Sequence, residues 1–414
     1  MQELEPSQVR SISSLAAGCP CCKHHPLTLD RIVVERGALL EAAPYLKERG
    51  YRQVALVSDE NTYRAAGGRL ASELAAAGIR TVLAGAKPDA QGDVVADEAG
   101  LIRLMLDIPQ EGTDALLAVG SGTLHDMVRF IAFKMGKPFI SVPTAPSVDG
   151  FTSVGAPLII GGEKITIPAI APDAIFADLD VLIEAPQPLV AAGFGDMLGK
   201  YTSLFDWRFG HLVRDEPYCP AAAQITKQAL LACVRNAEAI AERSTEGLRI
   251  LMNALIESGL AMQLFGQSHP ASGAEHHLSH YWEMEYLRLG RKQLLHGAKV
   301  GVACAVIAQT YHRLAADESF DKLAAGHGEE LRRGVREIPT ADELKRLLLQ
   351  AGGPETADQL GIDDELLSRS LREAPRVRPN RFTLLHACSA GNATHTAAEK
   401  RQDSLPWLPF KHDE

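Results

Sequence analysis

The stretch Ala115-Leu116-Leu117-Ala118-Val119-Gly120-Ser121-Gly122-Thr123-Leu124-His125-Asp126 runs from an apolar segment into a glycine-containing turn. An apolar run of this length that ends at a turn is typical of a buried strand, and we expect a helix to begin near Asp126. Glycines at a strand-to-helix turn let the backbone approach a phosphate group closely, and the amides at the helix start attract negative charge. Such a turn is usually only a tight connection, and the full Gly-x-Gly-x-x-Gly spacing is missing, so by itself it is weak evidence for a dinucleotide site.

Short apolar runs alternate with helix-like sequence on either side of this stretch. The runs occupy residues 54–57, 81–84 and 138–142, and residues 70–74 have helical character. This alternation predicts a parallel sheet covered by helices. A Gly161-Gly162 turn between β-branched residues predicts an antiparallel hairpin over residues 157–167.

The sequence changes in character after Pro186-Gln187-Pro188. Strand signals nearly vanish, and long stretches rich in Ala, Leu, Glu and Arg follow. We therefore expect an α/β protein with an N-terminal, Rossmann-like parallel-sheet domain over 1–184 and an all-helical domain over 185–414. Ligands commonly bind between domains, so the cleft is the expected site.

Composition narrows the function classes. The chain has 414 residues, 46% of them hydrophobic, and a net charge of -10 with no basic block. This charge argues against nucleic acid as the main partner and against adhesion to anionic membranes. The N-terminus has no signal-peptide pattern, and no uninterrupted apolar stretch reaches the roughly 20 residues that span a bilayer. We expect a cytosolic enzyme that acts on a small molecule.

A group of histidines predicts a metal site in the helical half. Within Gly273-Ala274-Glu275-His276-His277-Leu278-Ser279-His280, a helix would place His276 and His280 one turn apart on one face. Leu295-His296-Gly297 offers a third imidazole at a helix start, and Gly193-Phe194-Gly195-Asp196 offers a carboxylate. Such a set suits zinc, nickel or ferrous iron and leaves a coordination position open for substrate. His277 lies about 100° around the helix and is expected at the surface.

Cysteines form a second group at the N-terminus. The chain has seven, which in a cytosolic protein are better interpreted as thiols than as disulfides. Cys219, Cys233, Cys304 and Cys388 are scattered and are expected to be small buried hydrophobes. Cys19, Cys21, Cys22, His24 and His25 could hold a metal, yet no partner pair follows at zinc-finger spacing. Soft thiolates would close the coordination shell, so we expect this cluster not to serve catalysis.

Two polar segments follow strands of the first domain. Asp59, at the end of the run 54–57, could bind a ribose hydroxyl or simply cap a helix, and the residues leave both interpretations open. The segment 144–153 is dense in hydroxyls and turn formers and directly follows the run 138–142. Ligands of open α/β sheets bind at the carboxyl ends of strands, although these hydroxyls could also satisfy the loop's own backbone.

Several motifs together resemble the sn-glycerol-1-phosphate dehydrogenases, and the bacterial branch most of all. They are the Gly-Ser-Gly-Thr turn, Pro-Thr-Ala-Pro-Ser-Val-Asp-Gly at 143–150, Gly-Phe-Gly-Asp-Met-Leu-Gly-Lys-Tyr-Thr-Ser at 193–203, Pro-Ala-Ser-Gly-Ala-Glu-His at 270–276 and Leu-His-Gly at 295–297. The likeness covers about residues 32–308, and the wider group includes glycerol dehydrogenases, iron-containing alcohol dehydrogenases and dehydroquinate synthases. It implies reduction of dihydroxyacetone phosphate to sn-glycerol 1-phosphate with NAD(H) or NADP(H), in glycerophospholipid synthesis, by a homodimer.

The same resemblance assigns roles to individual residues. The metal, Ni²⁺ or Zn²⁺ with Fe²⁺ as a further option, would be held by Asp196, His276 and His296, in the helical domain. Substrate contacts would come from Asp149, Asp196 and His280. Together with the turn discussed above, the expected nucleotide-binding residues are Asp59, Gly120, Ser121, Gly122, Thr123, Leu124, His125, Asp126, Thr144, Ala145, Pro146, Ser147 and Ser153. Relatives commonly have Glu after the His-Gly pair, where this chain has Ala298.

Some roles remain open at the level of sequence. His280 could supply the proton that the product alkoxide needs, or it could orient a neighbour. Lys200, four residues after Asp196, could reach the substrate phosphate or be structural. The arginines 376, 378 and 381 are expected to form an ordinary charged loop. Rival functions are a glycerol or alcohol dehydrogenase, a dehydroquinate synthase-like cyclase and a non-catalytic nucleotide or metal sensor.

Overall fold

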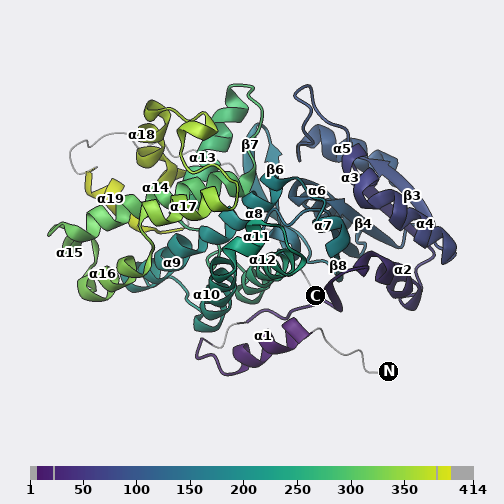
Figure 1. The fold of residues 1–414 in the computed structure, drawn as a ribbon, viewed down its shortest axis with the longest axis horizontal. Helices are drawn as coiled ribbons and strands as arrows, with labels where there is room; N and C mark the ends of the chain where they lie inside the picture. Colours follow the sequence, from purple (N-terminus) through teal and green to yellow (C-terminus); the bar gives the residue numbers. More distant parts are fainter. Residues whose placement is uncertain (1–6, 22–23, 379–380, 393–414) are drawn as a thin grey trace, which may run out of the picture.

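The computed structural model describes residues 7–21, 24–378 and 381–392. In these ranges a parallel sheet with covering helices lies beside a bundle of helices (Figure 1). The sheet contains β1 (Arg31–Glu35), β2 (Gln53–Ser58), β3 (Arg80–Gly85), β4 (Ala115–Gly120), β5 (Phe139–Pro143) and β8 (Ala174–Asp178). Its helices are α2 (Ala38–Glu48), α3 (Glu60–Thr62), α4 (Gly68–Ala76), α5 (Glu98–Asp107), α6 (Gly122–Met135) and α7 (Leu179–Leu182). The predicted fold class is therefore confirmed.

The strand order β1-β8-β5-β4-β2-β3 explains the apolar runs. Alternate residues of β4 pack into two different cores, with Leu117 on one face and Leu116 on the other. A strand that is buried on both faces needs apolar residues throughout, which is why residues 54–57 and 115–119 have no polar alternation. Sequence reasoning did not identify β1 and β8, although Ile32-Val33-Val34 and Ile175-Phe176-Ala177 carry the same signal.

The order also reverses at one point in the sheet. The chain goes from β2 outward to β3 and then returns to place β4 on the other side of β2. The carboxyl ends of β2 and β4 therefore flank a topological switch point, which is where open α/β sheets bind ligands.

The helix that follows β4 begins earlier than expected. We expected a start near Asp126, but α6 begins at Gly122. Strand β4 ends at Gly120, and Ser121 is the single residue between strand and helix.

The predicted hairpin is confirmed as β6 (Gly155–Ile160) and β7 (Glu163–Pro168). Gly161 and Gly162 have φ of 61° and 80°, a conformation that favours glycine and makes a two-residue hairpin turn. The hairpin reaches across to the helical half, because the backbone N–H of Lys164 donates to the Met284 sulfur at 3.1 Å.

Beyond residue 186 the described chain is helical. The elements are α8 (Gln187–Leu198), α9 (Lys200–Arg214), α10 (Pro220–Arg235), α11 (Ala237–Ala241), α12 (Thr245–Phe265), α13 (Ala274–Arg288), α14 (His296–Ala316), α15 (Phe320–Leu323), α16 (Gly328–Glu337), α17 (Ala341–Gln350), α18 (Asp364–Glu373) and α19 (Leu384–Asn392). The N-terminal α1 (Ser7–Ala17) packs against α10 of this half and not against the sheet (Figure 1).

The most apolar helix of the described chain is a core helix. In the described ranges one helix, α12, is long and apolar enough to cross a membrane by length and composition, and 67% of its apolar window is buried. It packs against α8 and α10, as a core helix does.

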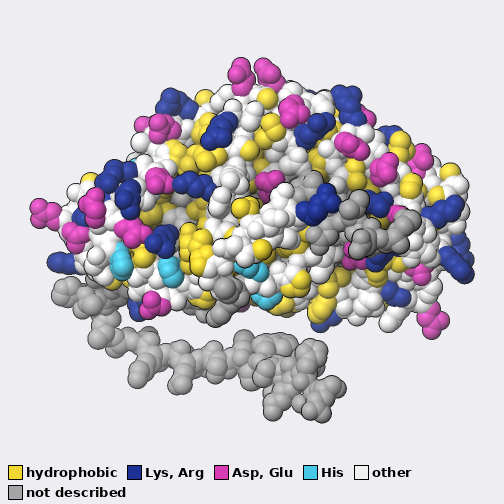
Figure 2. All heavy atoms as spheres, turned by 90° about the horizontal axis from the view of Figure 1, so that it is seen from below, with side chains coloured by type: hydrophobic (Ala, Val, Ile, Leu, Met, Phe, Trp, Pro, Cys, Tyr) yellow, Lys and Arg dark blue, Asp and Glu magenta, His cyan; other side chains and the backbone are white. Residues whose placement is uncertain are grey.

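On the face shown in Figure 2, acidic and basic side chains are interspersed, in keeping with charges spread along the chain.

Candidate active site

Glycines let α8 and α14 approach so closely that their functional side chains meet. A Cβ on Gly195 of α8 would crowd the Gly297 carbonyl oxygen, and one on Gly297 would overlap the carbonyl oxygen of Ala192. Because α14 begins at His296, this close packing places the His296 ring beside Asp196 of α8. The glycines flanking both residues in the sequence are therefore part of the site.

Asp196, His276 and His296 form one group of candidate ligands. Their ligand atoms all lie within 4.8 Å of one another. The distance from His276 Nε2 to Asp196 Oδ1 is 3.8 Å, and the ring centroids of His276 and His296 are 5.2 Å apart. As predicted, residues 274–288 are helical, and His280 lies one turn from His276 with ring centroids 6.0 Å apart.

The state of these side chains fits a divalent cation. Glu275 Oε1 lies 2.8 Å from His276 Nδ1, which leaves Nε2 available toward Asp196. Burial, with nearby cationic side chains, lowers the pKa of His296 and of the neighbouring His280 well below the ordinary value. Both imidazoles are therefore held in the neutral form, which is the form that a metal ligand such as His296 must have. The Nδ1 of His296 is buried and finds no hydrogen-bond partner in the described part of the chain.

Glu275 is a functional residue that sequence reasoning missed. Its carboxylate accepts hydrogen bonds from the Thr202 hydroxyl and the Gly273 backbone N–H, each at 2.6 Å, as well as contacting His276. A carboxylate that fixes the ring of a ligating histidine is a common outer-shell arrangement. The available signal was an acidic residue directly before His276 at the start of the expected helix.

Lys200 lies between two carboxylates. Its ammonium is 2.8 Å from Asp149 Oδ2 and 2.9 Å from Asp196 Oδ1, and it donates to the Ala271 carbonyl at 3.2 Å. Burial alone would lower the pKa of Lys200, but the two carboxylates raise it, so the ammonium stays charged. With all three N–H groups engaged and no exposed surface, Lys200 is placed to fix Asp149 and Asp196, which leaves none of its donors for a substrate phosphate.

A cleft of about 1650 Å³ runs between the sheet and the helical half. Many of the sequence-predicted residues line it: Asp59, Ser121, Gly122, Thr123, Leu124, Asp126, Ser147, Asp149, Ser153, His276, His280 and His296. The remaining ones are not in its wall: Gly120, His125, Thr144, Ala145, Pro146, Asp196 and Lys200. His125 supports the wall from behind, because its ring nitrogens bond to the Ser121 carbonyl and the Ser141 hydroxyl, each at 2.8 Å.

The sheet end of the cleft suits the phosphates and ribose of a dinucleotide. Gly122, the first residue of α6, has no room for a Cβ because Val148 packs against it, so the loop backbone itself forms the surface. Asp59 lines the cleft and also caps α3, accepting from the Thr62 backbone N–H through Oδ1 at 2.8 Å. Asp59 therefore caps a helix and also lies in the cleft wall, beside the switch point, so its two expected roles are compatible.

Cationic side chains also line the cleft. Lys164 and Lys299 share the Glu283 carboxylate at 2.8 Å each, which leaves a net positive charge on the trio. Arg378 donates to the Ser272 hydroxyl at 3.1 Å, while burial and the nearby Arg381 lower its pKa to about 10, so it is charged at neutral pH. Arg378 and Arg381 are therefore part of the cleft wall, and the expectation of an ordinary charged loop is wrong for these two.

Two further expectations need correction. His277 is buried and not at the surface, because the C-terminal segment covers α13 and brings His386 against it with ring centroids 5.3 Å apart. Cys233 and Cys304 are buried as expected, and Cys388 is partly buried. Cys219 is also buried, but its sulfur lies in the N-terminal cysteine cluster instead of in apolar surroundings. Cys22, which belonged to the predicted cluster, lies outside the described residues.

Comparison with known proteins agrees with this geometry. Residues 33–186 match the family model described as iron-containing alcohol dehydrogenase. The glycerol-1-phosphate dehydrogenase [NAD(P)+] of Geobacillus stearothermophilus is 46% identical over 392 residues, covering 91% of this chain and 97% of the relative. The protein of that name from Pyrococcus horikoshii is 35% identical and covers 72% of this chain and 77% of the relative.

Solved structures show the same fold at low sequence identity. The crystal structure of glycerol dehydrogenase from Schizosaccharomyces pombe has a TM-score of 0.64 at 19% identity and covers 88% of both chains. Sulfoacetaldehyde reductase from Bifidobacterium kashiwanohense, solved with NAD+, also has a TM-score of 0.64, at 15% identity over 90% of this chain and 99% of that one. From its sequence relatives, the chain belongs to the glycerol-1-phosphate dehydrogenase [NAD(P)+] family, within the wider group of iron-containing alcohol dehydrogenases.

Proposed function

We propose that the chain is an oxidoreductase that reversibly reduces dihydroxyacetone phosphate to sn-glycerol 1-phosphate with NADH or NADPH. The observation that carries this proposal is that one cleft holds all the groups this reaction needs. Its lining includes the switch-point turn, the rings of His276 and His296, which lie within 4.8 Å of the buried Asp196, and several cationic side chains. A ketone that carries a phosphate would thus have its carbonyl near the metal ligands and its anionic end near the cationic side chains.

The roles of the side chains follow from their contacts. Asp196, His276 and His296 would hold one divalent ion, Ni²⁺ or Zn²⁺ with Fe²⁺ as the alternative, which when bound would polarise the ketone carbonyl as a Lewis acid. Glu275 fixes the ring of His276, and Lys200 fixes Asp196 and Asp149. His280 lines the cleft, and burial favours its neutral form. It would therefore relay the proton that the product oxygen requires, donating from one ring nitrogen while the other nitrogen accepts a proton from solvent.

We propose that the substrate phosphate binds at Arg378, with Lys164 and Lys299 as further cations of the same cleft. Among the described residues, Arg378 donates hydrogen bonds to the Ser268 and Ser272 hydroxyls, and no carboxylate there bonds to its guanidinium. Burial lowers the pKa of Lys299 to about 8, so a nearby dianion would favour its charged form. Guanidinium groups bind phosphate through paired, charge-assisted hydrogen bonds, which suits this position.

We also propose the finer assignments that the resemblance suggests. The nucleotide would bind to domain 1–184 and the metal to domain 185–414. The protein would be a cytosolic homodimer whose product enters glycerophospholipid synthesis. Two hydrophobic cores on the sheet faces support the first domain, whereas the third core joins the helical half to α1 and to sheet-half residues such as Phe151 and Ile175.

Substrate comparison is the direct test of the proposed function. With purified, metal-loaded protein and NADH, we expect kcat/KM for dihydroxyacetone phosphate to exceed that for dihydroxyacetone by a factor on the order of 10², because only the former engages the cationic wall. Steady NADH oxidation separates this activity from a cyclase that recycles its nucleotide. Equal or better turnover of the unphosphorylated ketone would instead identify a glycerol or alcohol dehydrogenase.

Asp59 should set the cofactor preference. If its carboxylate accepts hydrogen bonds from the adenosine ribose, it disfavours the additional phosphate of NADPH, and NADH is preferred. We expect Asp59→Ser to narrow the NADH-to-NADPH ratio of kcat/KM by about tenfold, or about 1.4 kcal/mol. Serine is the informative replacement because it keeps a helix-capping oxygen while removing the charge. An unchanged ratio would show that Asp59 acts on the helix alone.

A further inference from the structure

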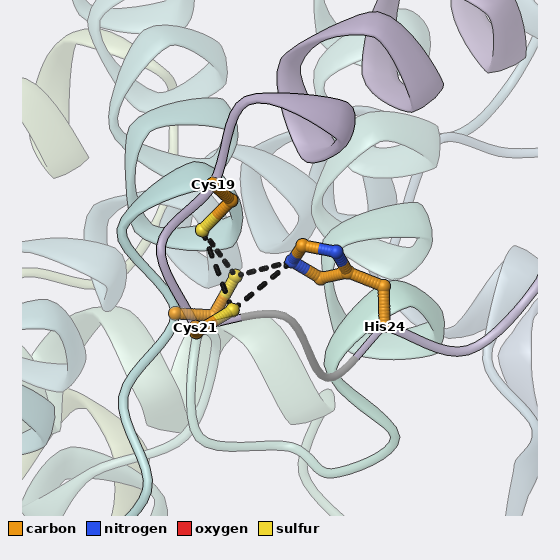
Figure 3. Close-up of side chains that lie close together, drawn as sticks. Cys19, Cys21 and His24 are labelled. Carbon is orange, nitrogen blue, oxygen red and sulfur yellow. Dashed lines mark hydrogen bonds between the residues drawn. The ribbon is translucent and has the colours of Figure 1, made fainter.

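Four metal-binding side chains meet at a place that the proposed reaction does not use. Cys19, Cys21 and His24 come from the segment after α1 and point toward one another (Figure 3). Cys219, which directly precedes α10, completes the group, and the four donor atoms all lie within 4.8 Å of one another. The sequence could not indicate this fourth member, because it lies 200 residues from Cys19.

The distances match a tetrahedral zinc site. Zinc bonds of about 2.3 Å to sulfur and about 2.0 Å to nitrogen imply tetrahedral edges of about 3.8 Å between sulfurs and about 3.5 Å between sulfur and nitrogen. Cys19 Sγ lies 3.3 Å from Cys21 Sγ and 3.8 Å from Cys219 Sγ. His24 Nε2 lies 3.1 Å from Cys21 Sγ and 3.3 Å from Cys219 Sγ. All four distances are within about 0.5 Å of the expected edges.

One backbone donor faces the Cys219 sulfur, whereas burial raises the pKa of this thiol. Its sulfur accepts a hydrogen bond from the Ala222 backbone N–H at 3.3 Å, at the first turn of the 16-residue helix α10. The positive end of a helix stabilises a negative charge at this position. Pro220 follows at the start of the helix, where its missing N–H costs no hydrogen bond.

We propose that Cys19, Cys21, His24 and Cys219 form a structural zinc site of the Cys₃His type. Three thiolates and one imidazole are a soft ligand set that selects zinc, and four protein ligands leave no position for substrate. The metal would join the N-terminal segment to α10, which otherwise meet through the packing of α1. Residues 24–29 have no regular secondary structure, so a cross-link here would supply order that the backbone does not.

The site also connects to the cleft through the next residue. The backbone N–H of His25 donates to the Leu264 carbonyl at 2.8 Å, and the His25 ring packs so tightly on Gly266 that a Cβ there would overlap it. Gly266 and the residues that follow it line the cleft. We therefore assign the zinc a structural role in anchoring this segment, with no contact to the reacting atoms.

Cobalt substitution can test the site in the whole protein. Cobalt bound by thiolates gives an intense sulfur-to-metal charge-transfer absorption, which the oxygen and nitrogen ligands of Asp196, His276 and His296 cannot produce. In the cobalt-substituted wild type and in cobalt-substituted Cys233→Ser, we expect this absorption. In the same two proteins without cobalt, we expect one equivalent of zinc in addition to the catalytic metal. Cys233 is the matched control because it is a buried cysteine of the same helix outside the cluster.

Cys21→Ser and Cys219→Ser should lose both the absorption and the one metal equivalent. Their kcat for ketone reduction should stay within about twofold, while Tm falls by about 5 °C or more. In the wild type, a thiol-selective mercurial should release the same single equivalent of zinc, which keeps the test decisive if a variant fails to fold. Absence of the thiolate absorption and of mercurial-released zinc in the wild type would overturn the proposal. Retention of both by Cys219→Ser would overturn it equally.

Discussion

Replacement of His276 or His296 by Ala should lower kcat/KM for dihydroxyacetone phosphate by a factor on the order of 10³ or more. Each histidine contributes one of three candidate ligands that lie within 4.8 Å of one another, so either replacement leaves two. The metal then dissociates, and the negative charge that develops on the ketone oxygen during hydride transfer loses its stabilisation. Metal analysis of each purified variant should show the loss of one equivalent.

His277→Ala is the control for this prediction. His277 is the next residue of the same helix and is also buried, but its ring faces His386 and not the metal group. This variant should keep its catalytic metal. Chelation of the wild type should abolish turnover, and nickel or zinc should restore it, whereas neither should restore His276→Ala or His296→Ala. Full activity in a demonstrably metal-free preparation would refute the proposed mechanism.

Arg378→Met should lower kcat/KM for dihydroxyacetone phosphate by a factor on the order of 10², mainly through KM. Methionine keeps much of the apolar stem but removes a guanidinium that stays charged in the cleft. Activity on unphosphorylated dihydroxyacetone should change much less, because that substrate has no phosphate to lose contact with. The ratio of the two specificity constants therefore reports phosphate recognition and not general damage to the site.

Two further variants define the role of this arginine. Arg376→Met changes the same residue type two positions earlier, at an exposed site outside the cleft, and should leave the ratio unchanged. Arg378→Lys should recover part of the loss, because it restores the charge without the paired N–H groups. Equal losses on both ketones in Arg378→Met would show that Arg378 supports the fold through Ser272 and does not bind phosphate.

The catalytic assignments depend on residues that no local pattern would reveal. Glu275 looks like one more acidic residue at a helix start, and its value comes from the hydrogen bonds that it accepts from Thr202 and Gly273. Arg378 lies in a sequence segment that reads as a charged loop. It reaches the cleft because the segment 381–384 is tied to the start of α13, where Asp206 bonds both the Ala274 and the Leu384 backbone N–H groups.

The sequence by itself determined the elements whose signal is local. Continuous apolar runs predicted the buried parallel strands, the Gly161-Gly162 pair predicted the hairpin, and the four-residue spacing of His276 and His280 predicted a shared helix face. The motifs of the sequence also suffice to identify the family. These inferences succeed because helix and strand periods and turn conformations depend on neighbouring residues in the chain.

Only the tertiary structure decided which distant residues meet. It placed Cys219 beside Cys19, Lys200 between Asp149 and Asp196, and Lys164 beside Glu283. It also buried His277, because residues 274–280 of α13 are all buried and the C-terminal segment brings His386 against its ring. Ion pairs, metal ligands and burial are properties of packed side chains that hundreds of residues can separate, so they depend on how helices and sheet pack together and not on spacing along the chain.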